Sequence, residues 1–229
     1  MTLHKSDYVV ESSRQLATVL TAVEGSVEIQ PIQNGRFKVT LKPLNPDTFI
    51  PRATCETSLP PDLISAFLYV SFAWLCESLA RHDDPDYVRD ILGRQLLAYF
   101  DPSVFKGKRL LDFGCGSGAS TLCLGAMFPE MEVVGVELDP SLVELARRVL
   151  AVRHLPNVQF LTSPDPKTLP PGIGSFDFVT LSAVYEHLLP EERRLVMPLI
   201  WSSMKYGGVL FVNQMPYRYF PYEHHSTGL

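Results

Sequence analysis

Short apolar runs alternate with longer amphipathic segments through the second half of the chain. Apolar runs predict strands at 109–113, 132–137, 158–161, 176–181 and 209–213, and helical spacing predicts helices at 120–128, 141–154 and 191–205. Runs that are apolar at consecutive positions are typical of strands covered on both faces. The alternation therefore predicts an α/β fold with a doubly wound, mostly parallel sheet.

The N-terminal part follows a different pattern. The stretch SVEIQPIQNGRFKVTLKPL has two β-rich arms around Asn34-Gly35, a dipeptide that favours a tight type I′ hairpin turn. Pro31 lacks a backbone donor, so we expect the first arm to be an edge strand or a bulged one. The five prolines between residues 43 and 61 predict a loop or an extended crossing, not a helix.

Two helices are expected next. Residues 62–79 are apolar almost all round, which predicts one buried helix. Asp84 as a cap and Pro85 in the first turn predict a helix that runs to about Phe100. Its inward side is expected to carry Tyr87, Val88, Ile91, Leu92, Leu96 and Tyr99. We therefore expect an N-terminal extension over 1–105 (hairpin, proline-rich loop, two helices) and a main domain over 106–229.

Composition and charge restrict the partners. The chain has 229 residues, 46% hydrophobic, with 20 basic and 25 acidic residues and a formal charge of −5. This balance lacks the basic surplus that nucleic-acid binding needs, so we expect no nucleic-acid partner. The four cysteines show no paired spacing, the N-terminus has no apolar signal region, and the longest uncharged stretch, 63–76, is too short for a membrane helix. We expect a cytoplasmic protein with no membrane span.

The stretch LLDFGCGSGAS at 110–120 follows the first strand of the main domain. Gly114, Gly116 and Gly118 predict a turn whose bare backbone meets a ligand, although GCGSGA also fits the dinucleotide pattern G-x-G-x-x-A. Asp112 would repel a phosphate and attract a cation, such as the amino group and sulfonium of S-adenosylmethionine. The alternative is that Asp112 only hydrogen-bonds the backbone of the glycine turn.

A second carboxylate ends the next strand, in VVGVELDP. Glu137 can accept hydrogen bonds from the two hydroxyls of a ribose, which both an adenosyl cofactor and a nicotinamide dinucleotide contain. Asp139 is expected to cap the helix that opens at Pro140-Ser141.

Four motifs together, LLDFGCGSGAS, VVGVELDP, SFDFVTLSAVYEHL and MKYGGVLFV, resemble the class I S-adenosylmethionine-dependent methyltransferases over residues 106–213. The resemblance implies a Rossmann-like domain with S-adenosylmethionine as cofactor. It implies that Asp112 and the glycine turn, with Cys115, hold the methionine end, that Glu137 holds the ribose, and that Leu138 covers one face of the adenine. Asp165 would lie near the adenine amino group, and Ser182 and Ala183 are expected to contact the cofactor through their backbone.

Methyl transfer needs alignment more than covalent help, because the sulfonium is already a good leaving group. A hydroxyl acceptor would need a base, and Tyr185, Glu186 and His187 follow the fourth strand at the required place. His187 is the preferred base, because imidazole titrates near neutral pH. The alternative is that Glu186 and His187 only fasten this loop and cap the next helix. In the resembling family such a pair often supports the cofactor site without removing a proton.

The C-terminal tail PYRYFPYEHHST raises two further possibilities. Glu223, His224 and His225 could suggest a metal, but adjacent histidines on an extended strand point to opposite faces, so we expect none. A loop that contacts the acceptor is the preferred interpretation, with Tyr217, Tyr219, Phe220 and Tyr222. The family usually adds two more strands, so we expect the C-terminal strands to be missing and the domain to be truncated.

The expected acceptor is a small molecule, a lipid or a glycan, and the oligomeric state cannot be read from the sequence. The N-terminal extension is expected to cover the cofactor or shape the acceptor pocket. Two alternatives stay open: an NAD(P)-dependent oxidoreductase with a Rossmann domain, and a catalytically silent scaffold that binds an adenosyl cofactor.

Overall fold

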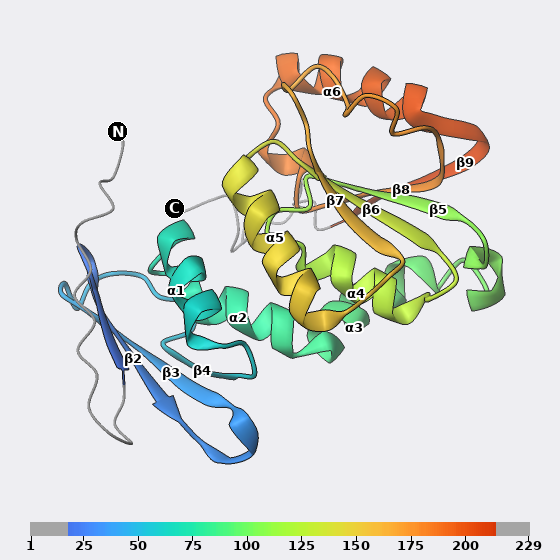
Figure 1. Ribbon diagram of the computed structural model, residues 1–229. Coiled ribbons are helices and arrows are strands. Elements are labelled where there is room, and N and C mark those ends of the chain that lie inside the picture. Colours follow the sequence, from blue (N-terminus) through green and yellow to red (C-terminus); the bar gives the residue numbers. More distant parts are fainter. Residues whose placement is uncertain (1–17, 214–229) are drawn as a thin grey trace. The chain divides into compact units, whose positions relative to one another are not determined.

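The structure is a computed structural model that describes residues 18–213 (Figure 1). The chain divides into two compact units, Met1–Tyr87 and Val88–Leu229. Each unit has its own core and is described by itself. The domain boundary expected at residue 105 stays a prediction.

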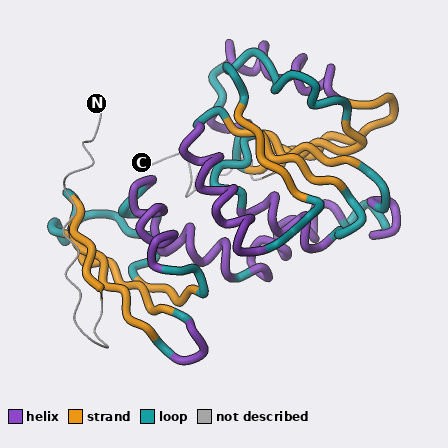
Figure 2. The backbone as a smooth tube through the Cα atoms, viewed as in Figure 1, coloured by secondary structure: helices purple, strands orange, loops and turns teal. Residues whose placement is uncertain are grey.

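The first unit contains a four-stranded antiparallel sheet in the order β1-β2-β3-β4 (Figure 2). Its strands are β1 (Thr18–Ala22), β2 (Gly25–Pro31), β3 (Phe37–Pro43) and β4 (Thr54–Thr57). The expected hairpin is β2 with β3. The stretch over 43–61 was predicted as a loop or an extended crossing, and its extended part includes β4, which pairs with β3 between the prolines at 51 and 60.

The hairpin turn is longer than the sequence predicted. Asn34 and Gly35 both have positive φ, 61° and 67°, as an Asn-Gly turn requires. However, they belong to a 3₁₀ turn, Gln33–Gly35, closed by a hydrogen bond from the Ile32 N–H to the Arg36 carbonyl (2.9 Å). The prediction of an edge or bulged first arm was also wrong, because β2 lies between β1 and β3. Pro31 is tolerated at the end of β2, two residues beyond the pair between Thr18 and Ile29.

Two helices replace the single one expected over 62–79: α1 (Pro61–Val70) and α2 (Leu75–Asp83). The chain is extended at Ser71, whose hydroxyl accepts a hydrogen bond from the Trp74 N–H (3.4 Å) at the start of α2. A serine that bonds the backbone locally competes with the helical pattern, which accounts for the break. Both helices bury their apolar side chains, and α2 packs on β3 and β4.

The third helix, α3 (Pro85–Leu96), begins as predicted but ends earlier. The Asp84 carboxylate accepts a hydrogen bond from the Asp86 N–H (3.1 Å), so it caps this helix. Val88, Leu92 and Leu96 are buried as expected. Tyr99 was expected to face inward and is 77% exposed, because the helix stops three residues before it. The expected inward side chains of Tyr87 and Ile91 lie outside the described part of the structure.

The second unit contains a five-stranded parallel sheet in the order β7-β6-β5-β8-β9. The strands are β5 (Arg109–Phe113), β6 (Glu132–Glu137), β7 (Val158–Thr162), β8 (Phe176–Ser182) and β9 (Met204–Asn213). The helices are α4 (Ala119–Met127), α5 (Pro140–Arg153) and α6 (Pro190–Ser203). These bounds agree with the predicted elements to within a residue or two, apart from β9, which begins five residues earlier. The doubly wound, Rossmann-like fold is therefore confirmed.

Helices cover both faces of this sheet, with α4 and α5 on one side and α6 on the other (Figure 1). Successive strand residues point to opposite faces, so Leu111, Val134 and Val179 pack with Val196 and Ile200 of α6. The C-terminal strands expected to be missing would lie beyond Asn213, outside the described residues. Among the helices of residues 18–213, none has the length and apolar character needed to cross a membrane.

Candidate functional site

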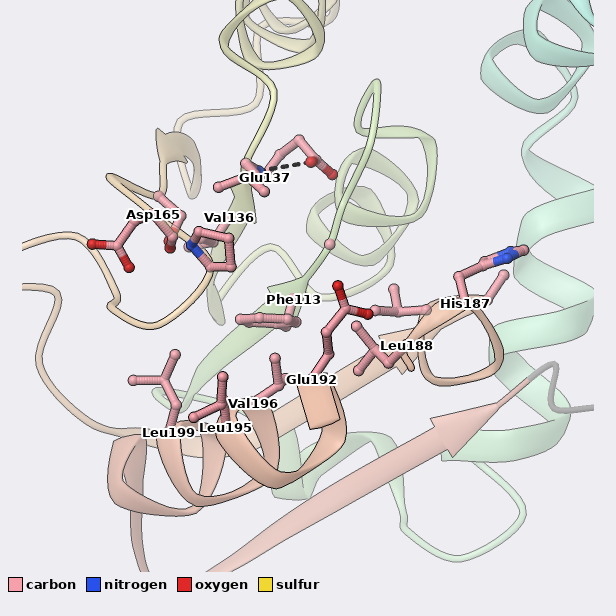
Figure 3. A pocket seen from close by; sticks show the side chains of 16 residues that line it. Phe113, Val136, Glu137, Asp165, His187, Leu188, Glu192, Leu195, Val196 and Leu199 are labelled. Atoms are coloured by element: carbon pink, nitrogen blue, oxygen red, sulfur yellow. Dashed lines mark hydrogen bonds between the residues drawn. The ribbon is translucent and has the colours of Figure 1, made fainter. Parts of the chain in front are cut away.

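A cavity of about 340 Å³ lies at the carboxyl ends of the parallel strands (Figure 3). This is the edge at which open α/β sheets bind ligands. Six of the residues predicted for the site line it: Gly114, Glu137, Leu138, Asp165, Ala183 and His187. The other predicted residues do not line the cavity. They are Asp112, Cys115, Gly116, Gly118, Ser182, Tyr185 and Glu186.

The three glycines of the turn after β5 have different surroundings. All three have positive φ: 72° at Gly114, 55° at Gly116 and 89° at Gly118. A Cβ at Gly118 would lie 2.5 Å from the ring of Phe160, and one at Gly114 would lie 2.7 Å from Val184. A Cβ at Gly116 would meet nothing within 4 Å. Gly114 and Gly118 thus serve packing as well as the turn, and Gly116 is the position whose backbone has open space beside it.

The Asp112 side chain is enclosed between β5 and α4. It is 1% exposed and accepts a hydrogen bond from the Thr121 hydroxyl (2.6 Å). Burial raises the pKa of Asp112 to about 7, the hydrogen bond from Thr121 opposes that shift, and the negative charge of Glu137 adds to it. The partner of Asp112 is therefore a side chain of α4. The alternative of a bond to the glycine backbone is not what the structure records, and the expected cofactor contact of Asp112 stays a prediction.

The Glu137 carboxylate connects the end of β6 to the glycine turn. It accepts hydrogen bonds from the N–H groups of Gly116 (3.0 Å), Leu138 (2.6 Å) and Asp139 (3.1 Å). A carboxylate has about four acceptor positions, so one is left for a further donor. The neighbouring Asp139 caps α5 as predicted, through a bond from the Ser141 N–H (2.8 Å).

Asp165 lines the cavity from the loop that follows β7, but its carboxylate is engaged in its own turn. It accepts a hydrogen bond from the Lys167 N–H (2.7 Å), and the residue is exposed. Ser163 beside it is buried and donates to the Thr168 carbonyl (2.5 Å). The loop is therefore held by short internal bonds, as its prolines and small polar residues favour.

The loop after β8 carries the three predicted catalytic residues in a 3₁₀ turn, Tyr185–His187. Ahead of it Ala183 has a φ of 54°, a left-handed conformation that is uncommon for a residue with a Cβ. His187 lines the cavity and its side chain is 59% exposed. The Glu186 side chain is only 1% exposed, with an oxygen 3.9 Å from His187 Nε2. Tyr185 lies against the guanidinium of Arg193, 4.4 Å from the ring centre.

The first turn of α6 is capped by a different residue from those proposed. Glu192 accepts a hydrogen bond from the Leu189 N–H (2.7 Å), so neither Glu186 nor His187 is needed as the cap. Glu192 also lines the cavity, and sequence reasoning missed it. Figure 3 shows Glu192, Leu195, Val196 and Leu199 rising from α6 toward Phe113, with Glu137 on the opposite side. The spacing 192, 195, 196 and 199 is the signal that could have identified this wall.

Carboxylates give the cavity its electrostatic character. Among residues 18–213, Glu137, Asp165 and Glu192 line it together with one imidazole, that of His187, and no lysine or arginine of this part of the chain is in the lining. Such a lining attracts a cation and repels a phosphate. Apolar residues supply most of the remaining wall, among them Leu195, Val196 and Leu199 of α6.

The predicted tail of aromatic and histidine residues, 217–225, lies outside the described residues. Within 18–213, no three histidine, cysteine, aspartate or glutamate side chains gather closely enough to hold a metal ion.

Residues 110–208 match the family model described as "Methyltransferase domain". Trans-aconitate 2-methyltransferase of Methylobacterium radiotolerans is 36% identical over 106 residues, which are 46% of this chain and 37% of that protein. Demethylmenaquinone methyltransferase of Thermus thermophilus is 36% identical over 115 residues, 48% of each chain. The solved structure of coclaurine N-methyltransferase, bound to N-methylheliamine and SAH, has 23% identity and a TM-score of 0.46, covering 56% of this chain and 35% of that one.

The chain spans about half or less of the length of the curated relatives it matches. The segment that matches the family model begins in β5 and ends in β9, so it contains both the glycine turn and the strand ends that line the cavity. Over these residues the chain is similar to methyltransferase domains.

Proposed function

We propose that this protein transfers a methyl group from S-adenosylmethionine to a small-molecule acceptor by direct displacement. The observation that carries the proposal is the cavity beside the glycine turn: the described residues that line it include three carboxylates and no lysine or arginine. S-adenosylmethionine has two cationic groups and no phosphate. A nicotinamide dinucleotide would bring two phosphates toward the same carboxylates, so this lining disfavours the oxidoreductase alternative.

The residues of the chain fit the parts of this cofactor. The open space beside Gly116 admits the amino acid end, and the remaining acceptor position of Glu137 suits a ribose hydroxyl. Leu138 and Asp165 lie on the side of the cavity where the adenine would follow. Asp112 acts from behind the turn, by fastening the start of α4 through Thr121. The backbone of Ala183, held in its unusual conformation, completes the wall on the side of β8.

The bound cofactor supplies an activated methyl group. The chain orients the cofactor and the acceptor and limits the water around them. The apolar side chains of α6 on one wall of the cavity favour a displacement with little water around the reacting groups once cofactor and acceptor are bound. His187 lies at the rim with its imidazole accessible, so it can exchange a proton with solvent. The acidic lining and the net charge of −5 both favour a small acceptor over a nucleic acid.

Isothermal calorimetry with S-adenosylhomocysteine and with NADH tests this proposal. We expect S-adenosylhomocysteine to bind, NADH to give no heat, and Glu137→Gln to weaken S-adenosylhomocysteine at least about tenfold, because a bond to an ionised acceptor is among the stronger ones. Glu144→Gln is the matched control, since Glu144 is exposed on α5 and does not line the cavity. Binding of NADH in preference to S-adenosylhomocysteine, or equal losses in the two variants, would refute the proposal.

A further inference from the structure

Two cysteines meet inside the first unit, between the antiparallel sheet and α2. Cys55 lies in β4 and is 8% exposed, and Cys76 lies in the first turn of α2 and is fully buried. Cys55 is paired with Val39 across β3 and β4, and the Cys76 thiol donates to the Val39 carbonyl, with 3.8 Å between sulfur and oxygen. The helix therefore places the Cys76 sulfur over the strand pair that carries Cys55.

The two thiols share a hydrogen bond, which gives them different acidities. This bond lowers the pKa of Cys55, because the thiolate form accepts the S–H group of Cys76. Burial opposes the shift, the positive charge of Arg52 favours it, and the negative charges of Asp83 and Glu77 oppose it. The same bond, together with burial, raises the pKa of Cys76. Cys55 is thus the thiol that ionises first, and Cys76 is its protonated neighbour.

The two cysteines of the second unit have different surroundings. Burial raises the pKa of Cys123 to about 11. Burial and the negative charges of Asp112 and Glu137 raise the pKa of Cys115. Of the four cysteines in the chain, all of which the structure describes, Cys55 alone has a lowered pKa. Because the thiolate is the nucleophilic form, Cys55 is the most reactive of the four.

Cys55 lies at an edge of the antiparallel sheet. Its strand β4 has four residues and is the last in the order β1-β2-β3-β4, so it pairs with β3 on one side. Short strands of this kind open locally at low cost, and part of Cys55 is already exposed. A small oxidant therefore has a route to this sulfur.

We propose that Cys55 and Cys76 form an oxidation site, at which a peroxide converts the two thiols to an intramolecular disulfide. The new bond joins β4 to α2 and closes a loop that contains the whole of α1, Pro61–Val70. It stabilises the first unit, because a cross-link restricts the unfolded chain more than the folded one. The described residues that line the cavity begin at Phe113, so the oxidation site is separate from it and does not depend on the function proposed above.

The reaction balances with two thiols and one peroxide. The Cys55 thiolate attacks a peroxide oxygen, the O–O bond breaks, and Cys55 becomes a sulfenic acid while the departing hydroxide is protonated to water. The Cys76 sulfur then attacks the Cys55 sulfur, so the S–S bond forms and the S–O bond breaks. The second hydroxide takes the proton of Cys76 and leaves as water. The two sulfurs lose two electrons in total, and the peroxide gains them.

Oxidation of the folded chain followed by mass spectrometry tests the inference. The reduced full chain is treated with hydrogen peroxide, the remaining thiols are alkylated, and the peptides are mapped without reduction. We expect a link between Cys55 and Cys76, a mass lower by two hydrogen atoms, and free thiols at Cys115 and Cys123. Cys55 should react at least about tenfold faster than Cys123, because more of it is thiolate.

Matched alanine variants separate the roles of the two thiols. Cys76→Ala should leave Cys55 as a sulfenic acid that dimedone labels, because the second thiol is gone. Cys55→Ala should leave Cys76 reduced and unlabelled, because its proton is held more tightly. Cys123→Ala is the control, and it should form the disulfide as the wild type does. Equal dimedone labelling of Cys55 and Cys76 in the two variants would contradict the assignment of Cys55 as the attacking thiol.

A melting curve of the oxidised wild type needs no variant, so it is safe from substitutions that only misfold the chain. We expect the oxidised protein to melt at a higher temperature than the reduced one, and dithiothreitol should reverse the rise. Links that involve Cys115 or Cys123, links between two chains, or four free thiols at a peroxide dose that oxidises free cysteine would each overturn the inference. An oxidised protein that melts at a lower temperature would overturn it as well, because the bond would then distort the native fold.

Discussion

Three carboxylates near the carboxyl ends of the parallel strands are placed in three different electrostatic situations. Asp112 is buried against a hydroxyl, Glu137 is held by backbone amides, and Glu186 is buried with no donor. The sequence motifs marked all three as site residues. The different surroundings of the three carboxylates follow from the groups that each one contacts. A sequence motif does not specify these contacts.

The stability of the protein should depend on pH through Asp112. Burial raises the pKa of Asp112 to about 7 in the native state, from a value of 3.8 for the free side chain. Between these values the unfolded chain has lost its proton and the native chain holds it, so the free energy of unfolding falls as pH rises. The contribution of Asp112 to the free energy of unfolding does not change with pH below the lower pKa or above the upper pKa.

Asp112→Asn removes this titration while keeping an oxygen that can accept from Thr121. We expect the wild type to lose up to about 4 kcal/mol more unfolding free energy than the variant between about pH 4 and pH 8, since one pKa unit corresponds to about 1.4 kcal/mol. Urea denaturation of both proteins at the two pH values measures this difference in unfolding free energy. The contributions of the other carboxylates are the same in both proteins and cancel. Parallel pH profiles would show that Asp112 ionises normally.

The glycine turn allows stability and binding to be separated with two matched variants. Gly118→Ala places a methyl group 2.5 Å from Phe160 at a φ of 89°, so we expect it to lower stability by about 2–4 kcal/mol. Gly116→Ala meets open space at a φ of 55°, so it should lower stability by only about 1–2 kcal/mol. Its methyl group would occupy the space proposed for the cofactor, and S-adenosylhomocysteine affinity should fall at least about tenfold.

Denaturant unfolding and calorimetry on both glycine variants measure these two effects. The Gly118→Ala protein, studied where it is still folded, should keep most of its affinity. Unchanged affinity in Gly116→Ala would mean that the cofactor does not approach that backbone.

At the scale of elements, the local sequence pattern predicted the helices and strands of the second unit well and those of the first unit less well. Strands such as β5 and β6 are short, apolar runs bounded by turns, so each is identified by its own residues. In the first unit, α1 and α2 share one apolar pattern and are separated only by the local bonding of Ser71. The strand β4 has little pattern of its own and exists because β3 offers it an edge.

The side chain of Asn157 connects two elements that the hydrophobic pattern of the sequence predicts separately. Its Nδ2 group donates to the carbonyls of Gly125 (2.9 Å), Phe128 (3.1 Å) and Met131 (3.0 Å), and so ties the end of α4 to the start of β6. We expect Asn157→Ala to lower the free energy of unfolding by about 2–3 kcal/mol, because these carbonyls lose the hydrogen bonds that Asn157 donates. Asn157→Asp, which has the same shape and no donor, should be at least as destabilising.

Chemical denaturation of the Asn157 variants checks this expectation, with S-adenosylhomocysteine binding as the reference measurement. Affinity should stay within about twofold of the wild type, because Asn157 does not line the cavity. A stable Asn157→Asp protein would show that side-chain shape, and not donation, holds this junction.

At the scale of the whole molecule, the two units have separate cores and the chain is acidic. The first core lies between the antiparallel sheet and α2, and the second lies on both faces of the parallel sheet. With 25 acidic and 20 basic residues, the chain lacks the positive surplus that releases counterions from a nucleic acid.

We therefore expect no binding to a fluorescent single-stranded oligonucleotide at low ionic strength, about 50 mM salt, where phosphate contacts are strongest. Fluorescence anisotropy with the full chain measures this directly. Binding that weakens steeply as salt is added would contradict the expectation and would point to a nucleic-acid acceptor.

The order of strands and helices in the second unit, the glycine turn and the caps Asp84 and Asp139 were all determined by sequence alone, because each depends on residues close together in the chain. Tertiary structure decided the rest. It enclosed Asp112 against Thr121, turned α6 into a wall of the cavity through Glu192 and Leu195, and left Glu186 buried without a donor. Burial and partners depend on residues that are distant in sequence and brought together only by folding, so no local pattern contains them.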